Sequence, residues 1–118
     1  MGMRNLILAA AMLPGVAQAQ ANLSCVGVRP VWQLEVSGDT ASLWFPDESI
    51  MDVMNDVPAE QRDWPRAMTL VGFEDTAILL VDKEMCLVNE TEFGIEAHVL
   101  TQRGFDPILL KGCCRSSE

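Results

Sequence analysis

The sequence is poor in the side chains that carry most enzyme chemistry. Its 118 residues include one histidine, His98, and no tyrosine. The G-x-S-x-G nucleophile sequence, the H-E-x-x-H zinc sequence and the phosphate-binding glycine loops are all missing. We therefore expect a non-catalytic protein, and we assign no catalytic residue, no metal ligand and no cofactor. An enzyme centred on His98 and a nearby carboxylate is the alternative.

Basic residues are also scarce. Eight lysines and arginines stand against 17 aspartates and glutamates, so the net charge is −9 at pH 7. A charge of this sign disfavours binding to nucleic acid and to anionic membrane surfaces, and it favours cationic partners or simple solubility. The acids are scattered along the chain and do not form an acidic tail. We expect no nucleic-acid partner, and a cationic protein if the chain has a partner.

Long apolar runs are missing after the N-terminus. Residues 6–13 (LILAAAML) form such a run, behind the positive charge of Arg4 and ahead of Ala17-Gln18-Ala19. This order is typical of a secretory signal with an A-x-A cleavage site. The run is about half of the roughly 20 residues that a membrane-spanning helix needs. We predict a signal at residues 1–19 that is cleaved after Ala19. A single exported domain, residues 20–118, is then expected in the periplasm, with no membrane insertion after cleavage.

The predicted mature chain holds four cysteines, Cys25, Cys86, Cys113 and Cys114. An even number of cysteines in a small exported domain indicates two disulfides. Since neighbouring residues on a strand point to opposite faces, we expect Cys113 and Cys114 to reach different partners, either Cys25 or Cys86. Each bridge contributes on the order of 3–5 kcal/mol by the loop-entropy model. Bridged cysteines are not available as nucleophiles.

The apolar pattern alternates with a period of two residues more often than with the helical period of 3.6, which is typical of β-strands. Residues 31–36 and 41–45 flank the turn sequence Ser37-Gly38-Asp39-Thr40 and predict a hairpin. Residues 49–55 are ambiguous between a strand and a short helix, and residues 56–65 are predicted to form an exposed loop. The remaining predicted strands are residues 66–71, 76–81, 84–88, 94–101 and 108–114.

Seven or eight short strands with frequent turns predict an all-β fold, either a small antiparallel barrel or a sandwich. The long helix-period stretches that are expected of α/β or all-α proteins are absent. Within residues 94–101, Ile95, Ala97 and Val99 alternate with polar residues. If the apolar set points inward, His98 lies on the polar face of this strand together with Glu96.

The three tryptophans differ in the faces that they are predicted to occupy. Trp32 falls on an apolar strand face and is expected in the core. Trp44 lies on the face opposite its apolar neighbours, so it is either buried by two-sided packing or exposed as a binding anchor. Trp64 lies in the charged loop and is either an interaction site or folded back onto the β domain. Four methionines of apolar stretches are expected in the core: Met51, Met54, Met68 and Met85.

Two short motifs carry a resemblance to a known family. Residues 27–34 (GVRPVWQL) resemble the G-x-E-P-F-W-x-[LV] motif of small exported bacterial β proteins. Cys86 and residues 112–115 (GCCR) resemble the second half of that family, in which a C-S-D-G-M-S-D sequence precedes a C-terminal G-C. These proteins are similar in style to META/heat-shock-lipoprotein domains and to membrane-bound inhibitors of C-type lysozyme. The positions kept from the first motif are Gly27, Pro30 and Trp32.

The chain also departs from the family pattern. Arg29 stands where the first motif has an acid, and Val31 stands where it has an aromatic residue. Residues 87–92 (LVNETE) do not preserve the polar S-D-G-M-S-D loop. If that loop carries the function of the family, this chain has lost or altered that function. The motif positions that this chain shares with the family pattern are therefore structural ones.

The resemblance implies a disulfide pairing and one specific activity. It pairs Cys86 with Cys113, which leaves Cys25 with Cys114. Lysozyme inhibitors of this style insert a short loop with a serine into the cleft of the enzyme, and Ser37-Gly38 is the stretch that loosely matches such a loop. We therefore expect a binding or envelope-maintenance protein, with inhibition of a cationic enzyme such as lysozyme as an alternative.

Overall fold

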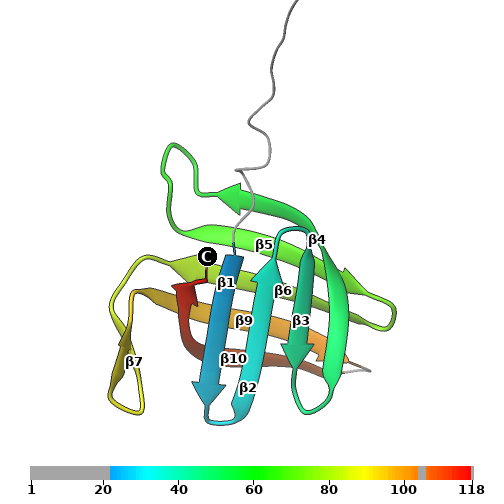
Figure 1. Cartoon of the computed structure of the whole chain (residues 1–118). Coiled ribbons are helices and arrows are strands. Elements are labelled where there is room, and N and C mark those ends of the chain that lie inside the picture. Colours follow the sequence, from blue (N-terminus) through cyan, green and yellow to red (C-terminus); the bar gives the residue numbers. More distant parts are fainter. Residues whose placement is uncertain (1–21, 104–105, 118) are drawn as a thin grey trace, which may run out of the picture.

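The computed structural model describes residues 22–103 and 106–117, whose arrangement is shown in Figure 1. The predicted signal, residues 1–19, lies outside the described residues. Within the described ranges there is no helix long and apolar enough to cross a membrane. The strands are β1 (Asn22–Val28), β2 (Val31–Ser37), β3 (Thr40–Trp44), β4 (Glu48–Pro58), β5 (Arg66–Gly72), β6 (Asp75–Asp82), β7 (Cys86–Val88), β8 (Thr91–Phe93), β9 (Ile95–Arg103) and β10 (Asp106–Ser116).

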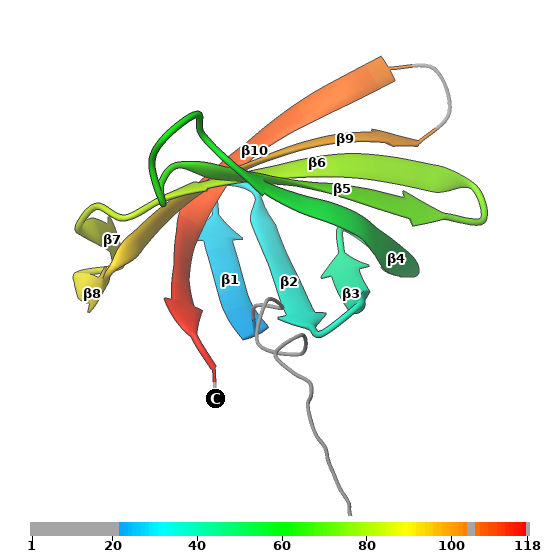
Figure 2. The same ribbon diagram turned by 90° about the horizontal axis from the view of Figure 1, so that it is seen from above.

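Eight of these strands close into an antiparallel barrel in the order β1-β10-β9-β6-β5-β4-β3-β2 (Figure 1 and Figure 2). Strands that are neighbours in the chain are paired around this ring. The exception is the β7–β8 hairpin, which is inserted between β6 and β9 and forms a separate two-stranded sheet. The pairing of β1 with β10 closes the ring. The structure confirms the predicted all-β fold, and it is a barrel rather than a sandwich.

Alternation along the strands determines which side chains enter the barrel. In β2, Trp32, Leu34 and Val36 are at most 2% exposed, whereas Gln33 and Glu35 are exposed. An eight-stranded barrel has an interior just wide enough for side chains to fill, so the inward residues form the hydrophobic core. Among the largest fully buried side chains are Trp32, Leu34, Leu43, Met51, Met68, Leu70, Leu79 and Leu110.

Two glycines make room for the indole of Trp32. Gly27 on β1 is paired with Trp32, and a Cβ at Gly27 would lie 2.6 Å from Trp32 Cδ1. A Cβ at Gly112 on β10 would lie 2.7 Å from Trp32 Cζ2 and would also meet the Val26 carbonyl oxygen. The indole Nε1 donates a hydrogen bond of 3.1 Å to the carbonyl oxygen of Lys111. Gly27 and Trp32 of the family-like motif therefore serve packing at the β1–β10 seam.

Two disulfides join opposite sides of β10 to different elements. Cys114 lies on the inner side and is bonded to Cys25, its cross-strand partner on β1. Cys113 lies on the outer side and is bonded to Cys86 at the start of β7. The prediction that the two adjacent cysteines reach different partners is confirmed, and so is the pairing that the family resemblance implies. Disulfides of this kind indicate an oxidising environment.

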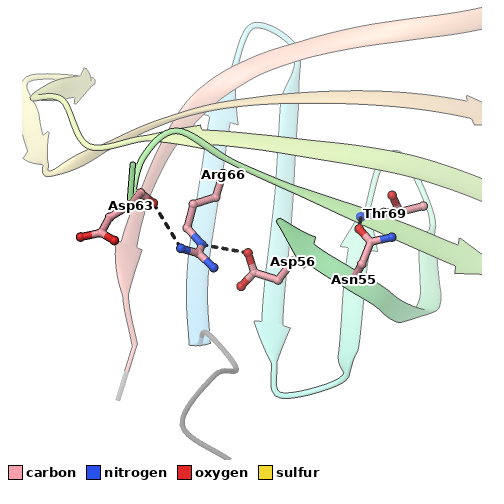
Figure 3. A network of polar contacts seen from close by, with 5 residues as sticks. All are labelled: Asn55, Asp56, Asp63, Arg66 and Thr69. Atoms are coloured by element: carbon pink, nitrogen blue, oxygen red, sulfur yellow. Dashed lines mark hydrogen bonds and ion pairs between the residues drawn. The ribbon is translucent and has the colours of Figure 1, made fainter. Parts of the chain in front are cut away.

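The segment between β4 and β5 is tied back to the barrel. Arg66 Nε donates a hydrogen bond of 2.8 Å to Asp56 Oδ1, and Arg66 Nη1 donates one of 3.2 Å to the Asp63 carbonyl oxygen (Figure 3). Trp64 is partly buried against the hydrophobic core, and Lys83 Nζ lies 5.9 Å from the centroid of its ring. Of the two alternatives for Trp64, the structure has the side chain folded back onto the barrel.

The predicted boundaries around β4 are wrong in part. The ambiguous stretch 49–55 is a strand, and it continues so far that the predicted loop 56–65 begins only at Ala59. A bulge interrupts the β4–β5 register just before Asn55, whose Oδ1 accepts a hydrogen bond of 3.3 Å from the Thr69 amide (Figure 3). A bulge adds one unpaired residue to a strand, so it breaks the alternation by which a strand is recognised in sequence.

Three further expectations need correction. Residues 22–28 form β1, although no strand was predicted there. The strand predicted at 84–88 is limited to β7, and it pairs with β8 in a hairpin outside the barrel. Met54 and Met85 are exposed, unlike the buried Met51 and Met68. Met54 lies in the bulge and Met85 immediately precedes the hairpin, so neither points into the barrel.

Candidate binding surface

The outward sides of β2, β3 and β4 form a surface on which one tryptophan is exposed. We refer to it as the acidic face, and its residues are Val31, Gln33, Glu35, Ser42, Trp44, Glu48, Ile50 and Asp52. Trp44 is 43% exposed and is paired with Gln33 on one side and Glu48 on the other. Its neighbour in the chain, Leu43, points inward and is fully buried. The predicted opposition of Trp44 and Leu43 is confirmed, and Trp44 is exposed rather than buried. Its role as a binding anchor stays a prediction.

Apolar side chains extend the exposed surface of Trp44. Ile50 on β4 is paired with Ser42, two residues along β3 from Trp44, so Ile50 and Trp44 are diagonal neighbours on one face. Val31 on β2 lies two residues from Gln33, the partner of Trp44, and is diagonal to Trp44 in the same way. Val31 and Ile50 are each 57% exposed. The centre of the acidic face is therefore apolar.

Carboxylates surround this apolar centre. Glu35 lies on β2, and Glu48 and Asp52 lie on β4. Glu35 Oε2 accepts a hydrogen bond of 2.6 Å from Ser24 Oγ, and Glu48 Oε2 accepts one of 2.8 Å from Ser42 Oγ. These bonds restrain the two carboxylates. An ionised carboxylate has about four acceptor positions, so both can still accept hydrogen bonds from a partner.

The acidic face lies in a stretch of chain without basic residues. Residues 30–61 contain β2, β3 and β4, and they hold seven acidic residues and no lysine or arginine. Exposed charges are screened over a Debye length of about 8 Å at physiological ionic strength. Glu35 on β2 and the two carboxylates on β4 are separated by β3, about 10 Å across the sheet, and the Trp44 indole on β3 lies between them. The result is a negative surface around an exposed indole.

His98 lies on a different part of the barrel. It points outward on β9 on the same side as Glu96, as predicted, while Ala97 is buried. His98 and Glu96 line a shallow cavity of about 250 Å³ together with Asp82. Glu96 Oε2 lies 4.0 Å from Nζ of Lys111, which is the cross-strand neighbour of His98.

The Ser37-Gly38 stretch, which loosely matches an inhibitor loop, is part of a tight β2–β3 turn. Gly38 has a φ of 64°, and its amide donates a hydrogen bond of 3.0 Å to Asn22 Oδ1. It does not form a projecting loop.

Among the described residues, no group of three or more histidine, cysteine, aspartate or glutamate side chains is placed to hold a metal ion.

Sequence reasoning found Trp44 but missed the β4 part of the acidic face. Ile50 and Asp52 point outward because they alternate with Met51 and Val53, which are buried or partly buried. That alternation is present in the sequence, but it is short and is interrupted by the bulge. The outward positions of Ile50 and Asp52 could have been predicted only if residues 49–55 had been assigned as a strand.

No family model matches the chain, and no curated protein or solved structure matches it. The fold and the disulfides define its class: a small eight-stranded antiparallel barrel with a disulfide-linked hairpin on its outside. The resemblance carried by residues 27–34 stays a hypothesis.

Proposed function

We propose that the protein is an exported, non-catalytic binding protein of the periplasm and that it binds a cationic protein through the acidic face. The observation that carries this proposal is the exposed Trp44 indole, set between Gln33 and Glu48 among the described residues of the acidic face, none of which is a lysine or an arginine. The predicted signal at residues 1–19 and the two disulfides support an exported location. A role in envelope maintenance would operate through the same contact.

The chemistry of the acidic face favours a partner rich in arginine and lysine. Tryptophan is among the residues that most often dominate binding energy at protein interfaces. A guanidinium or ammonium group can also stack over its ring. Charge-assisted hydrogen bonds from the same partner can reach Glu35 and Glu48. Residues 20–118 carry seven basic and 17 acidic residues, so long-range attraction accelerates the encounter with a cationic protein.

The test uses affinity capture from a periplasmic extract with the mature domain as bait. The matched pair of variants is Trp44→Ala and Phe73→Ala. Phe73 is 97% exposed in the β5–β6 turn and lies outside the acidic face, so it controls for the loss of any exposed aromatic side chain. We expect captured proteins to have a high isoelectric point, to be lost with Trp44→Ala and to be retained with Phe73→Ala. Equal capture by both variants would overturn the proposal.

A charge-reversal pair tests the electrostatic part separately. Glu48→Lys places a cation beside Trp44, whereas Glu84→Lys makes the same change at an exposed position outside the acidic face. We expect Glu48→Lys to abolish capture and Glu84→Lys to weaken it only slightly. Capture by the unmodified domain should also fall as salt is added. A partner that is acidic and insensitive to salt would contradict the role of the carboxylates.

Inhibition of a cationic enzyme such as a lysozyme is a narrower form of the same proposal, supported by the same charge. Because the Gly38 turn is tied to Asn22, we assign the contact to the acidic face rather than to a loop inserted into the cleft. A lytic assay with several lysozymes tests this form. We expect inhibition by the mature domain and its loss with Trp44→Ala. Full lysis at micromolar domain with every lysozyme would exclude inhibition and leave the capture result to decide the wider proposal.

A further inference from the structure

A second surface feature differs from the acidic face in both shape and charge. The β7–β8 hairpin and the barrel border a cavity of about 320 Å³ where the β1–β2 turn, β7 and the middle of β10 meet. We refer to it as the hairpin pocket, and the lining residues that matter most are Val28, Arg29, Leu87, Asn89, Lys111 and Cys113. Its volume is at the lower end of the range of roughly 300–1,000 Å³ that is typical of small-molecule sites.

The charge of the hairpin pocket is opposite to that of the chain as a whole. Arg29 and Lys111 both line it, and among the described residues no aspartate or glutamate does. Lys111 Nζ is 4.0 Å from Glu96 Oε2, and the Lys111 side chain is 69% exposed. This contact is long and solvated, so it leaves the ammonium group free to turn toward a ligand. Two cations beside one cavity, in a chain of net charge −9, make a local site for an anion.

Part of the remaining wall of the hairpin pocket is apolar, beside the polar side chain of Asn89. Val28 approaches from the end of β1 and Leu87 from β7, and both side chains are exposed. Apolar surface in a concave site gains about 25 cal/mol per Å² when a ligand covers it. One water molecule takes up about 30 Å³ in the liquid. A cavity of about 320 Å³ therefore has room for on the order of ten non-hydrogen atoms.

We propose that the hairpin pocket binds a small carboxylate with a short apolar body, of the size of a medium-chain fatty acid. The Arg29 guanidinium receives the carboxylate through two parallel hydrogen bonds, and the Lys111 ammonium adds a third contact. The apolar body lies against Val28 and Leu87. The hairpin pocket adjoins the acidic face through the Val28–Val31 pair, but none of its lining residues belongs to that face.

The pocket depends on the outer disulfide. Cys86 and Cys113 both line it, and Cys86 Sγ lies 3.3 Å from the Gly112 carbonyl oxygen. Within the described residues, β7 forms a ladder with β8 and none with the barrel. The Cys86–Cys113 bridge is therefore the covalent tie that keeps this wall of the pocket against β10. Ligand binding should require that bridge.

The test is a titration of the isotope-labelled mature domain with sodium octanoate, followed by amide chemical shifts. We expect saturable shifts confined to residues 27–29, 86–89 and 111–113. Arg29→Gln should weaken binding roughly tenfold, the loss expected for one charge-assisted contact. Arg62→Gln, which removes an exposed arginine of the β4–β5 loop that does not line the pocket, should leave the affinity unchanged. The spectra of both variants also report whether the barrel is intact.

Two further ligands and two further variants decide the remaining outcomes. Octanol and octyltrimethylammonium have the same apolar body without the carboxylate, and both should bind much more weakly than octanoate. The double variant Cys86→Ser/Cys113→Ser should lose octanoate binding while the barrel amides keep their shifts. Trp44→Ala should bind octanoate normally, which separates this proposal from that of the acidic face. The proposal is overturned if octanoate gives no saturable shifts at millimolar concentration, or if octyltrimethylammonium binds equally well.

Discussion

Two adjacent cysteines on β10 hold two different regions of the molecule. Cys114 is fully buried on the inner side and is joined to Cys25, which is 89 residues away in the chain and 4.0 Å away between Cα atoms. Cys113 lies on the outer side and is joined to Cys86, which is 27 residues away and 5.7 Å away between Cα atoms. The inner bridge lies at the seam that closes the barrel. The outer bridge holds a hairpin against the outside of the barrel.

The difference between the two bridges is one of topology. The inner bridge connects β1 and β10, which are already paired through a ladder that includes Cys25 and Cys114 themselves. The ladder already holds the two strands together, so the bridge adds little restraint to the folded state. It acts mainly by constraining a long loop of the unfolded chain. The outer bridge closes a shorter loop, but it connects elements that share no ladder. We infer that the inner bridge sets global stability and the outer bridge sets local order.

The largest effect is expected from removing the inner bridge. The loop-entropy model assigns about 4–5 kcal/mol to a bridge that closes a loop of this length. Cys25→Ala/Cys114→Ala should therefore lower the free energy of unfolding by about that amount, measured by urea denaturation at 25 °C. This is a large share of the roughly 5–15 kcal/mol that keeps a domain folded. A loss no greater than that of the outer-bridge variant would contradict the comparison.

Removal of the outer bridge should have a smaller and more local effect. Cys86→Ser/Cys113→Ser opens a shorter loop, to which the same model assigns at most about 3–4 kcal/mol. Since the hairpin forms no ladder with the barrel, its amides should lose protection without the rest of the sheet. Amide hydrogen exchange should become fast in residues 86–93 and stay slow in β2, β5 and β6. Simultaneous loss of protection in the barrel would show that the outer bridge also supports the ring.

The alternation of side chains along a strand explains why the different partners of Cys113 and Cys114 were predictable from the sequence. The opposite directions of Cys113 and Cys114 follow from the period of a strand alone, and the structure confirms them. The hairpin itself was not predictable in the same way. Strands β7 and β8 have three residues each and no face in the barrel core, so they leave no apolar repeat. Their place depends on tertiary contacts with β10, namely the bridge to Cys113 and the Arg115 guanidinium, which lies 4.2 Å from the centroid of the Phe93 ring.

The inner wall shows a second limit of sequence reasoning. In β1 the inward positions are Leu23, Cys25 and Gly27, so only one of the three is a large apolar side chain. Inward and outward positions of β1 therefore differ little in hydrophobicity, and no strand was predicted there. The candidate surface was found only in part for a related reason. Trp44 follows from the pattern of its own strand, whereas its neighbour Ile50 depends on the register of β4, which the sequence does not determine.

The packed inner side of β10 gives a third prediction, intermediate in size. Gly112→Ala would place a Cβ 2.7 Å from Trp32 Cζ2 and against the Val26 carbonyl oxygen. Overpacking of this kind costs about 1–3 kcal/mol. The matched control is Gly94→Ala, because a Cβ at Gly94 has no atom within 4 Å. Urea midpoints should fall for Gly112→Ala and stay unchanged or rise slightly for Gly94→Ala. Equal midpoints would mean that the Trp32 site is looser than the structure has it.

The smallest effect on stability is expected on the outer wall, at the residue on which the proposed function depends. Trp44 is 43% exposed and faces away from the core, so Trp44→Ala should lower the free energy of unfolding by about 1 kcal/mol or less. The same change should abolish capture of a cationic partner. Stability and binding would then be carried by opposite sides of one barrel wall, with Leu43 and Trp44 as adjacent examples. Thermal unfolding followed by circular dichroism measures the first quantity and affinity capture the second. A loss of several kcal/mol together with the loss of capture would show that Trp44 is a structural residue, and the acidic face would no longer explain binding.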